Sequence, residues 1–185
     1  MRGPLPTVGR AVYAPRVARI PLPDGDQLEV IKALSLRPEF AKGVGGFDAA
    51  VWNSSLDWRL HELVRMRVAT INECSVCLGW RTPMAVEAGV TDDDLAAVIN
   101  PTDPRFSPAE RVALEYAARF CTDSANIGDA LMARLAEEFD SGEVVELTLV
   151  IAKYLAMGRF MQVLGLDQAC SLQMTNAGNV VDTNS

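Results

Sequence analysis

The feature that most constrains the fold is a helical periodicity that runs almost unbroken between the two ends of the chain. It is densest over residues 141–164, where apolar side chains surround most of the helix circumference, at Val144, Val145, Leu147, Leu149, Val150, Ile151, Leu155 and Met157. A helix of this kind has to be covered on several sides, by its own domain or by another subunit. We therefore expect it to be the central helix, and it favours a homo-oligomer. The sequence shows no strand-like alternation bounded by hairpin turns, so it predicts an all-α fold, a single-domain helical bundle.

Shorter segments with the same spacing predict the other helices. They span residues 27–36, 38–52, 56–72 and 75–88, a segment opened by Thr91, and residues 107–122 and 128–139. The segment 56–72 is the strongest, with apolar side chains at steps of three and four residues, at Leu60, Leu63, Val64, Val68 and Ile71. Ser107 and Glu110 have the spacing of a capping box, and Gly89 is expected to end the helix over 75–88.

The two ends of the chain depart from this pattern. Residues 1–25 hold half of the ten prolines, at Pro4, Pro6, Pro15, Pro21 and Pro23. Proline fixes φ and lacks a backbone N–H donor, so we expect an extended N-terminal arm here. Residues 171–185 are mostly small and polar and are expected to form a flexible C-terminal tail. The helical domain is placed between the two, over residues 26–170.

Composition and charge exclude several classes of protein. The chain has 185 residues, of which 49% are hydrophobic, so it can bury a core without disulfides or a metal. With 24 acidic and 17 basic side chains its formal net charge is −7, which argues against a nucleic-acid or anionic-membrane partner. No apolar stretch reaches the roughly 20 residues of a transmembrane helix, and the N-terminus does not resemble a secretory signal. We therefore expect a cytoplasmic protein.

Cys74 and Cys77 form the most informative motif, a C-x-x-C at the expected junction of two helices. The unpaired backbone N–H groups and partial positive charge of a helix start favour a thiolate. Two intervening residues also bring the sulfurs close enough for a disulfide, so the pair is a redox candidate. Two other interpretations stay open. One is a pair of inert core cysteines, and the other is a zinc site, for which the remaining cysteine and histidine ligands are Cys121, Cys170 and His61.

The pair belongs to a longer pattern. It comprises Glu62-Leu63-Val64-Arg65-Met66-Arg67-Val68-Ala69, then Asn72, Cys74 and Cys77, and the downstream Ala88-Gly89-Val90. This pattern resembles the carboxymuconolactone decarboxylase and alkyl hydroperoxidase D superfamily. The redox branch of that family carries a glutamate, eleven residues, C-x-x-C, three residues and a histidine, and Glu62, Cys74 and Cys77 have this spacing. With the helix start at Ser107 and the helix over 143–160, the resemblance covers residues 18–165.

The resemblance implies a helical bundle of the alkyl hydroperoxidase D type that reduces a peroxide or a disulfide through its thiols. Cys77 would be the deeper thiolate, which attacks the peroxide. Cys74 would resolve the sulfenic acid into a disulfide and then meet an external dithiol donor, a thioredoxin-like or lipoyl protein. Glu62 would be the base end of a proton relay. No cofactor or metal is implied, and a homo-oligomer, trimeric or hexameric, is expected.

This chain departs from the family pattern at Arg81, which stands where the family has its histidine. Arginine stays protonated and cannot shuttle a proton. Arg81 could instead hold Glu62 as an ion pair or stabilise a Cys77 thiolate by its charge. Val76 stands where some members carry histidine or tyrosine. Disulfide chemistry survives these changes, whereas efficient peroxidase turnover depends on a relay that is altered here.

Several neighbouring residues have both a structural and a functional interpretation. His61 is expected to be a partly exposed helical residue, and Glu62 could simply pair with Arg65 or Arg67. The structural interpretation is also preferred for Trp80, Met84, Cys121, Tyr154 and Arg159.

Two alternative functions remain open. The superfamily contains lactone decarboxylases that lack the cysteine pair, and Arg81 could bind the carboxylate of a small carboxylated lactone. The chain could also be a non-catalytic, redox-sensing oligomer whose cysteines change state without turnover.

Overall fold

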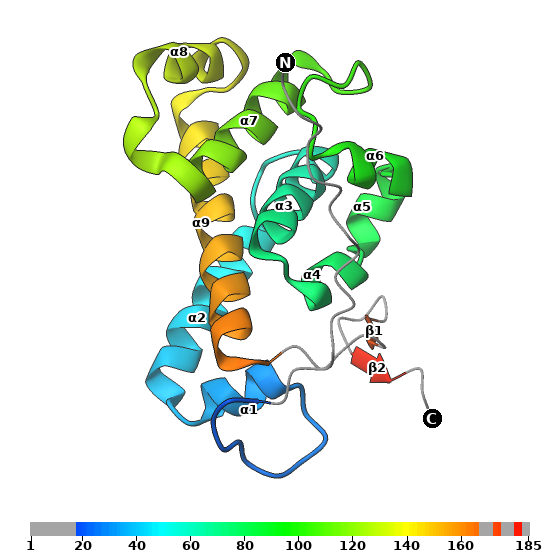
Figure 1. The fold of residues 1–185 in the computed structure, drawn as a ribbon, viewed down its shortest axis with the longest axis vertical. Helices are drawn as coiled ribbons and strands as arrows, with labels where there is room; N and C mark the ends of the chain where they lie inside the picture. The colour runs from blue at the N-terminus through cyan, green and yellow to red at the C-terminus, as the bar shows by residue number, and fades with distance from the viewer. Residues whose placement is uncertain (1–17, 167–171, 175–179, 183–185) are drawn as a thin grey trace, which may run out of the picture.

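Helices α3 (Trp58–Asn72) and α9 (Ser141–Leu164) form the centre of the molecule (Figure 1). They pack against each other, and α7 (Pro108–Asp123) packs against both. The computed structural model describes residues 18–166, 172–174 and 180–182. Every element within residues 18–166 is a helix, which confirms the predicted all-α fold.

The other helices surround this centre. They are α1 (Glu29–Ser35), α2 (Pro38–Trp52), α4 (Ser75–Gly79), α5 (Pro83–Glu87), α6 (Asp92–Ala97), the 3₁₀ helix η1 (Ser124–Asn126) and α8 (Asp129–Glu138). Helices α1 and α2 lie beside the C-terminal part of α9, whereas α4, α5 and α6 lie on the other side of α3 (Figure 1). Apart from the segment 75–88 and η1, which was not predicted, the bounds that were predicted from the periodicity lie within two residues of these.

Local capping signals explain why the predicted bounds hold. Helices α6, α7 and α9 each begin with a capping box, including the predicted one at Ser107 and Glu110. Helix α9 ends where Gly165 takes a φ of 68°, a conformation that glycine adopts without the steric penalty of a Cβ atom. These signals involve only a few neighbouring residues, so they can be recognised without knowing the tertiary structure.

The predicted helix over 75–88 is wrong in one respect, because the structure divides it into α4 and α5. Trp80 and Thr82 have extended backbones, and Pro83 occupies the first turn of α5. The residue before a proline is disfavoured in the helical conformation, so the chain leaves the helix there. Thr82 then caps α5 through its side chain. Cys77 therefore lies in a helix of only five residues, and Cys74 caps that helix.

The main hydrophobic core lies between α3, α7, α8 and α9. It is built from fully or nearly fully buried side chains, among them Leu60, Val64, Val68, Ala117, Leu135, Leu147 and Ile151. Helix α3 has ten buried residues out of fifteen, and these include the polar side chains of His61, Glu62, Arg65 and Asn72. The helix that carries the candidate glutamate is therefore the most enclosed one.

Helix α9 contacts α2, α3, α7 and α8, as expected of a central helix. It nevertheless exposes part of its apolar surface, because Val145, Leu149 and Val163 are 58%, 47% and 59% exposed. These three residues are called the α9 stripe below. The domain itself covers only some sides of this helix.

The first described residues lie beside the C-terminus of α9. The backbone N–H of Arg19 donates to the Leu164 carbonyl at 2.8 Å. Strands β1 (Leu172–Met174) and β2 (Val180–Asp182) pair in antiparallel register within the segment predicted as a tail, and the sequence pattern did not reveal them. Residues 1–17 of the predicted arm lie outside the described residues.

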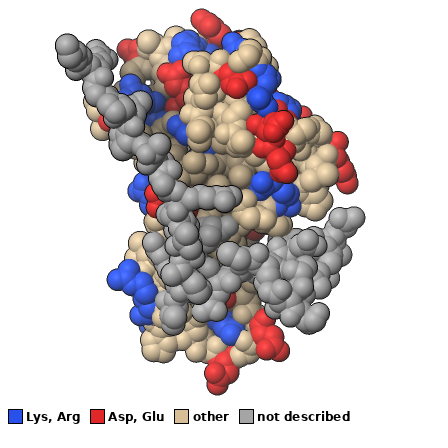
Figure 2. All heavy atoms as spheres, turned by 45° about the vertical axis from the view of Figure 1, so that its right-hand side comes forward, with Lys and Arg blue, Asp and Glu red and all other residues tan. Residues whose placement is uncertain are grey.

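Charges of both signs are interspersed over the face drawn in Figure 2, without a separate basic patch on that face. Arg59, for example, bonds Asp94 at 2.9 Å and Glu110 at 2.7 Å. Among the described helices, none is long and apolar enough to cross a membrane.

The contact between α3 and α9 yields a test of packing. Asn72 donates to the carbonyls of Tyr154 and Leu155, and its amide lies where a Cβ atom on Gly158 would project. We expect Gly158→Ala to lower the free energy of unfolding by about 1–3 kcal/mol. Gly45→Ala, in open space inside α2, is expected to raise it by about 0.5–1 kcal/mol. Urea denaturation measures both, and equal effects of the two substitutions would contradict this packing.

Candidate active site

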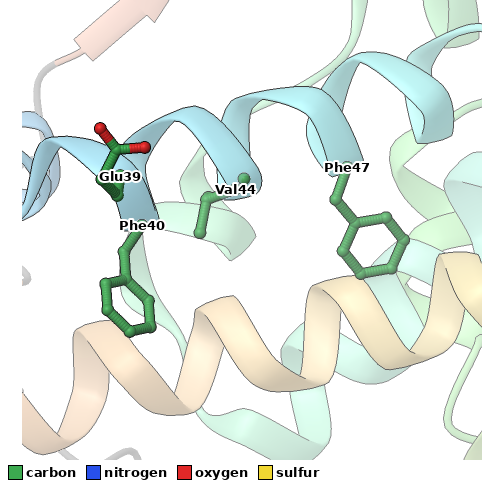
Figure 3. Close-up of a pocket in the computed structure, with 5 residues that line it drawn as sticks. Glu39, Phe40, Val44 and Phe47 are labelled. Carbon is green, nitrogen blue, oxygen red and sulfur yellow. The ribbon is translucent and has the colours of Figure 1, made fainter.

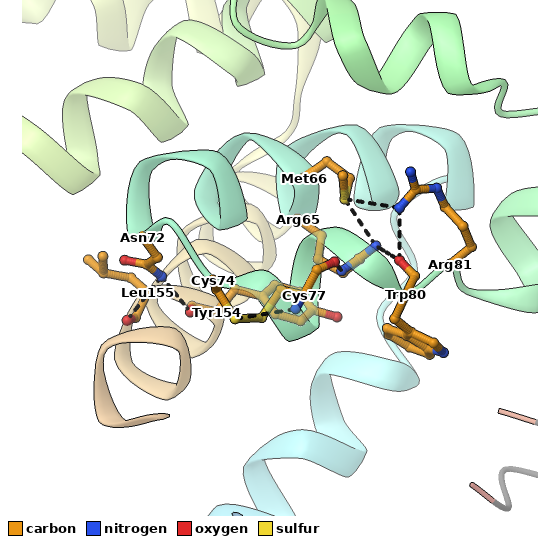
Figure 4. Close-up of a disulfide and its surroundings, with 9 residues drawn as sticks. All are labelled: Arg65, Met66, Asn72, Cys74, Cys77, Trp80, Arg81, Tyr154 and Leu155. Atoms are coloured by element: carbon orange, nitrogen blue, oxygen red, sulfur yellow. Dashed lines mark hydrogen bonds between the residues drawn. A yellow bond between two sulfur atoms is a disulfide. The ribbon is translucent and has the colours of Figure 1, made fainter. Parts of the chain in front are cut away.

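Cys74 and Cys77 lie on the turn that follows α3 and are joined by a disulfide (Figure 4). Glu73, with a φ of 52°, reverses the chain after Asn72. Cys74 then caps α4, and its Sγ accepts from the Cys77 backbone N–H at 3.3 Å. The Cα atoms lie 5.3 Å apart, within the usual range for a disulfide. The C-x-x-C spacing predicted that the two sulfurs could form a disulfide, and the structure contains this disulfide.

The two cysteines differ in how deeply they are buried. Cys74 is fully buried, in a small apolar cluster with Ala33, Met161 and Leu166. Cys77 packs against this cluster but keeps partial exposure. The expectation that Cys77 is the deeper cysteine is therefore wrong. Cys74 comes directly after the enclosed helix α3, whereas Cys77 lies one turn further along α4.

Glu62 is held in a buried ion pair with Arg65. Arg65 Nε lies 2.7 Å from Glu62 Oε2, and Arg65 Nη2 lies 2.7 Å from Glu62 Oε1. The two side chains are 0% and 2% exposed. The buried Thr82 hydroxyl also approaches Glu62 Oε2, at 3.4 Å. Both carboxylate oxygens are therefore occupied by donors.

The same guanidinium connects this ion pair to the cysteine turn. Arg65 Nη1 donates to the Cys77 carbonyl at 2.8 Å, and Nη2 donates to the Trp80 carbonyl at 2.9 Å (Figure 4). The guanidinium carbon also lies 5.1 Å from the centroid of the Trp80 ring. Arg65 thus brings the predicted Glu62 and Cys77 into one network. The sequence offered it only as a possible ion-pair partner of Glu62.

Arg81 takes a different position from the one expected. Its Nη1 donates to the carbonyls of Leu78 at 2.8 Å and Trp80 at 3.1 Å, and its Nε lies 3.5 Å from the exposed Asp92. Glu62 pairs with Arg65, so the ion pair suggested between Glu62 and Arg81 is not the one that forms. In Figure 4, Arg81 reaches the turn from the side of Trp80, away from the disulfide.

His61 is also buried, which corrects the expectation of a partly exposed side chain. It is 1% exposed, its Nε2 is hydrogen-bonded to the Tyr154 hydroxyl at 3.1 Å, and its ring stacks on Trp58. Burial lowers the pKa of His61 to about 4 and raises the pKa of Tyr154. Both groups are therefore neutral at pH 7. Burial also lowers the pKa of the neighbouring Lys153, which forms an ion pair with Asp48 of α2.

An aromatic cluster adjoins this network. The ring centroids of Trp52 and Trp58 are 5.6 Å apart, and those of Trp52 and Trp80 are 5.7 Å apart. These rings join α2, the start of α3 and the segment after α4. Trp80 therefore has a packing role, as expected.

Cys121 lies apart from the pair. Cys121 is buried in the main core, as expected, and burial raises the pKa of its thiol to about 11. Arg159 donates to the Cys121 carbonyl at 3.1 Å. Cys170 lies outside the described residues. Within the described ranges, no group of three or more histidine, cysteine or acidic side chains is arranged to hold a metal ion.

The sequence is similar to that of known proteins over part of its length. Residues 38–119 match the model of the carboxymuconolactone decarboxylase family. The chain is 35% identical over 108 residues to the uncharacterized protein YnjA of Escherichia coli strain K12, which covers 58% of this chain and 59% of that protein.

Solved structures share the fold. An uncharacterized peroxidase-related protein from Ralstonia eutropha JMP134, described as an alkylhydroperoxidase AhpD core, superposes with a TM-score of 0.67 at 18% identity. That match covers 84% of this chain and 94% of the other. ATU0492 from Agrobacterium tumefaciens, a protein of unknown function named as an AhpD antioxidant-defence candidate, has a TM-score of 0.61 at 20% identity, covering 80% and 95%. At these identities the likeness concerns the fold.

The fold and the cysteine motif therefore define an AhpD-like helical protein. Residues 38–119 are similar to the carboxymuconolactone decarboxylase family, and the fold is shared with AhpD-like proteins.

The burial of His61 makes stability depend on pH. Unfolded His61 binds a proton below its ordinary pKa of 6.5, whereas the folded protein resists protonation down to about pH 4. The contribution to stability is thus complete above pH 6.5 and is lost as the pH falls toward 4. Between pH 7 and 5 we expect the free energy of unfolding to fall by about 2 kcal/mol more in the wild type than in His61→Gln. Urea denaturation at both pH values measures this, and parallel losses would contradict it.

Proposed function

We propose that the protein is a thiol-dependent oxidoreductase whose Cys74–Cys77 pair cycles between dithiol and disulfide. Its substrate is a hydroperoxide or a disulfide, and its electrons come from an external dithiol donor such as a thioredoxin-like or lipoyl protein. The observation that carries the proposal is the disulfide itself, with one partly exposed cysteine on a turn fixed by Arg65.

The proposed cycle balances without a cofactor. The Cys77 thiolate attacks the outer oxygen of a hydroperoxide, and the O–O bond breaks to give an alcohol and a Cys77 sulfenic acid, with one proton taken up by the leaving oxygen. The Cys74 thiol then attacks the Cys77 sulfur, which forms the disulfide and releases water. A donor dithiol finally exchanges with the disulfide, so that the donor is oxidised and both cysteines are reduced.

Exposure supports the assignment of these roles. A substrate oxygen needs access to the attacking sulfur, and Cys77 is the cysteine with partial exposure. Cys74 is fully buried and can act only from within, which suits the resolving step. A donor would accordingly attack Cys77 rather than Cys74, unlike the order expected from the family resemblance.

The wild type and two cysteine variants test this proposal. Reduced wild-type protein treated with one equivalent of tert-butyl hydroperoxide is expected to lose two hydrogen atoms in the peptide that contains Cys74 and Cys77. Cys74→Ser is expected to stop at a sulfenic acid on Cys77, trapped by dimedone. The Cys77→Ser variant lacks the nucleophile, so its oxidation rate is expected to be at least about 100-fold lower than that of the wild type. Intact-mass and peptide mapping give all three results.

Cys121→Ser is the control, since Cys121 is buried away from the pair and should leave the oxidation rate unchanged. If the wild-type pair reacts no faster than free cysteine, the proposal is overturned. An assay for carbon dioxide release from a carboxylated lactone would then test the decarboxylase alternative.

We also propose that the chain forms a homo-oligomer, trimeric or hexameric. Besides the α9 stripe, the molecule exposes an open groove of about 420 Å³ on α2, lined by Glu39, Phe40, Gly43, Val44 and Phe47. Both phenyl rings point to the same side of α2, whereas Glu39 points away (Figure 3). Phe40 is 73% exposed, an unusual position for a large aromatic side chain. A second copy would remove these surfaces from water.

Sedimentation velocity tests this assembly. The wild type is expected to sediment as an oligomer, and the double variant Phe40→Ser, Leu149→Glu as a monomer, because a buried charge would disfavour the interface. Ile99→Glu changes another exposed apolar residue, after α6, and should leave the assembly intact. A monomeric wild type at micromolar concentration, or equal effects of the two charged variants, would reject the proposal.

A further inference from the structure

The Glu62–Arg65 ion pair has a fixed orientation relative to the cysteine turn. The Nε and Nη2 atoms of Arg65 face Glu62, and Nη1 faces the carbonyl of Cys77. The carboxylate therefore lies on the far edge of the guanidinium. Although the pair has no net charge, its positive end points toward Cys77.

Burial makes this orientation effective. The side chains are 2% and 0% exposed, so solvent and salt screen their field weakly. The Nη1 atom is 2.8 Å from the oxygen of Cys77, and the sulfur belongs to the same residue. A guanidinium has five N–H groups, and in the described part of the chain Nη1 makes one hydrogen bond, to that carbonyl.

Other positive charges near the turn are less suited to act on Cys77. Helix α4 has only five residues, so its dipole is short. Arg81 directs its guanidinium to the carbonyls of Leu78 and Trp80 and to Asp92. His61 is neutral because burial lowers its pKa to about 4, and Lys153 is paired with Asp48.

We propose that Arg65 is a positioning residue that stabilises the reduced pair as a Cys77 thiolate, and that Glu62 limits this effect by balancing the charge. Arg65 also fixes the backbone of the turn through two carbonyls. Glu62 acts through Arg65 rather than as a free base, because both of its oxygens already accept hydrogen bonds. This inference rests on the proposed redox role of the pair and names the residues that tune it.

Opposite substitutions in the ion pair provide the test. The readout is the alkylation rate of Cys77 by iodoacetamide as a function of pH, in reduced protein that carries Cys74→Ser, with peptide mapping to isolate Cys77. Arg65→Met removes the positive charge and is expected to raise the pH midpoint of alkylation by about one unit. Glu62→Gln removes the negative charge and is expected to lower the midpoint. A purely structural role would move both midpoints in the same direction.

Arg59→Met is the matched control. Arg59 lies on the same helix as Arg65, but its ion pairs are with Asp94 of α6 and Glu110 of α7 and not with the cysteine turn. It should leave the midpoint unchanged. Arg65→Lys keeps the charge without the two-pronged geometry and is expected to shift the midpoint less than Arg65→Met. If Arg65→Met does not fold, as judged by circular dichroism, Glu62→Gln and Arg65→Lys still decide the outcome.

The inference is overturned if Arg65→Met and Glu62→Gln shift the midpoint in the same direction, or if neither shifts it more than Arg59→Met. Alkylation requires no peroxide and no donor. Opposite shifts in a protein that does not react with hydroperoxide would therefore support the role of Arg65 while rejecting the proposed function.

Discussion

The rest of the site depends on one buried ion pair. Removing two charges from water costs several kcal/mol per ion, and mutual attraction offsets this only when the remaining donors are also satisfied. Arg65 meets this condition by bonding both oxygens of Glu62 and two carbonyls of the cysteine turn. The α3 helix, the disulfide turn and Trp80 are thereby held by a single side chain. Loss of either partner would leave an uncompensated charge inside the domain.

Helix α3 supplies this ion pair because it has no free face. Its apolar residues pack in two clusters against α6, α7, α8 and α9, and its polar residues bond groups of α6, α7, α9 and the cysteine turn. His61 and Asn72 are bound by Tyr154 and by carbonyls of α9. A helix enclosed in this way can fix reactive groups within a rigid frame, which a surface loop could not do as well.

The sequence predicted the helices well and the site only in part. Capping boxes, Pro108 and Gly165 act over a few residues, so the ends of α7 and α9 were accessible from local patterns. The spacing of Glu62, Cys74 and Cys77 likewise revealed the motif. Arg65 and His61 were not assigned to the site, because polar residues on an amphipathic helix normally face solvent and only tertiary packing shows otherwise. The broken helix at Pro83 was accessible in principle, since the residue before a proline disfavours helix.

The aromatic cluster has a consequence for how this protein can be observed. All three tryptophans of the chain lie in it, and Trp80 stacks with the guanidinium that binds the cysteine turn. Intrinsic tryptophan emission therefore originates from this one cluster, which Arg65 connects to the cysteine turn. The chain thus carries its own optical reporter of the packing around Arg65.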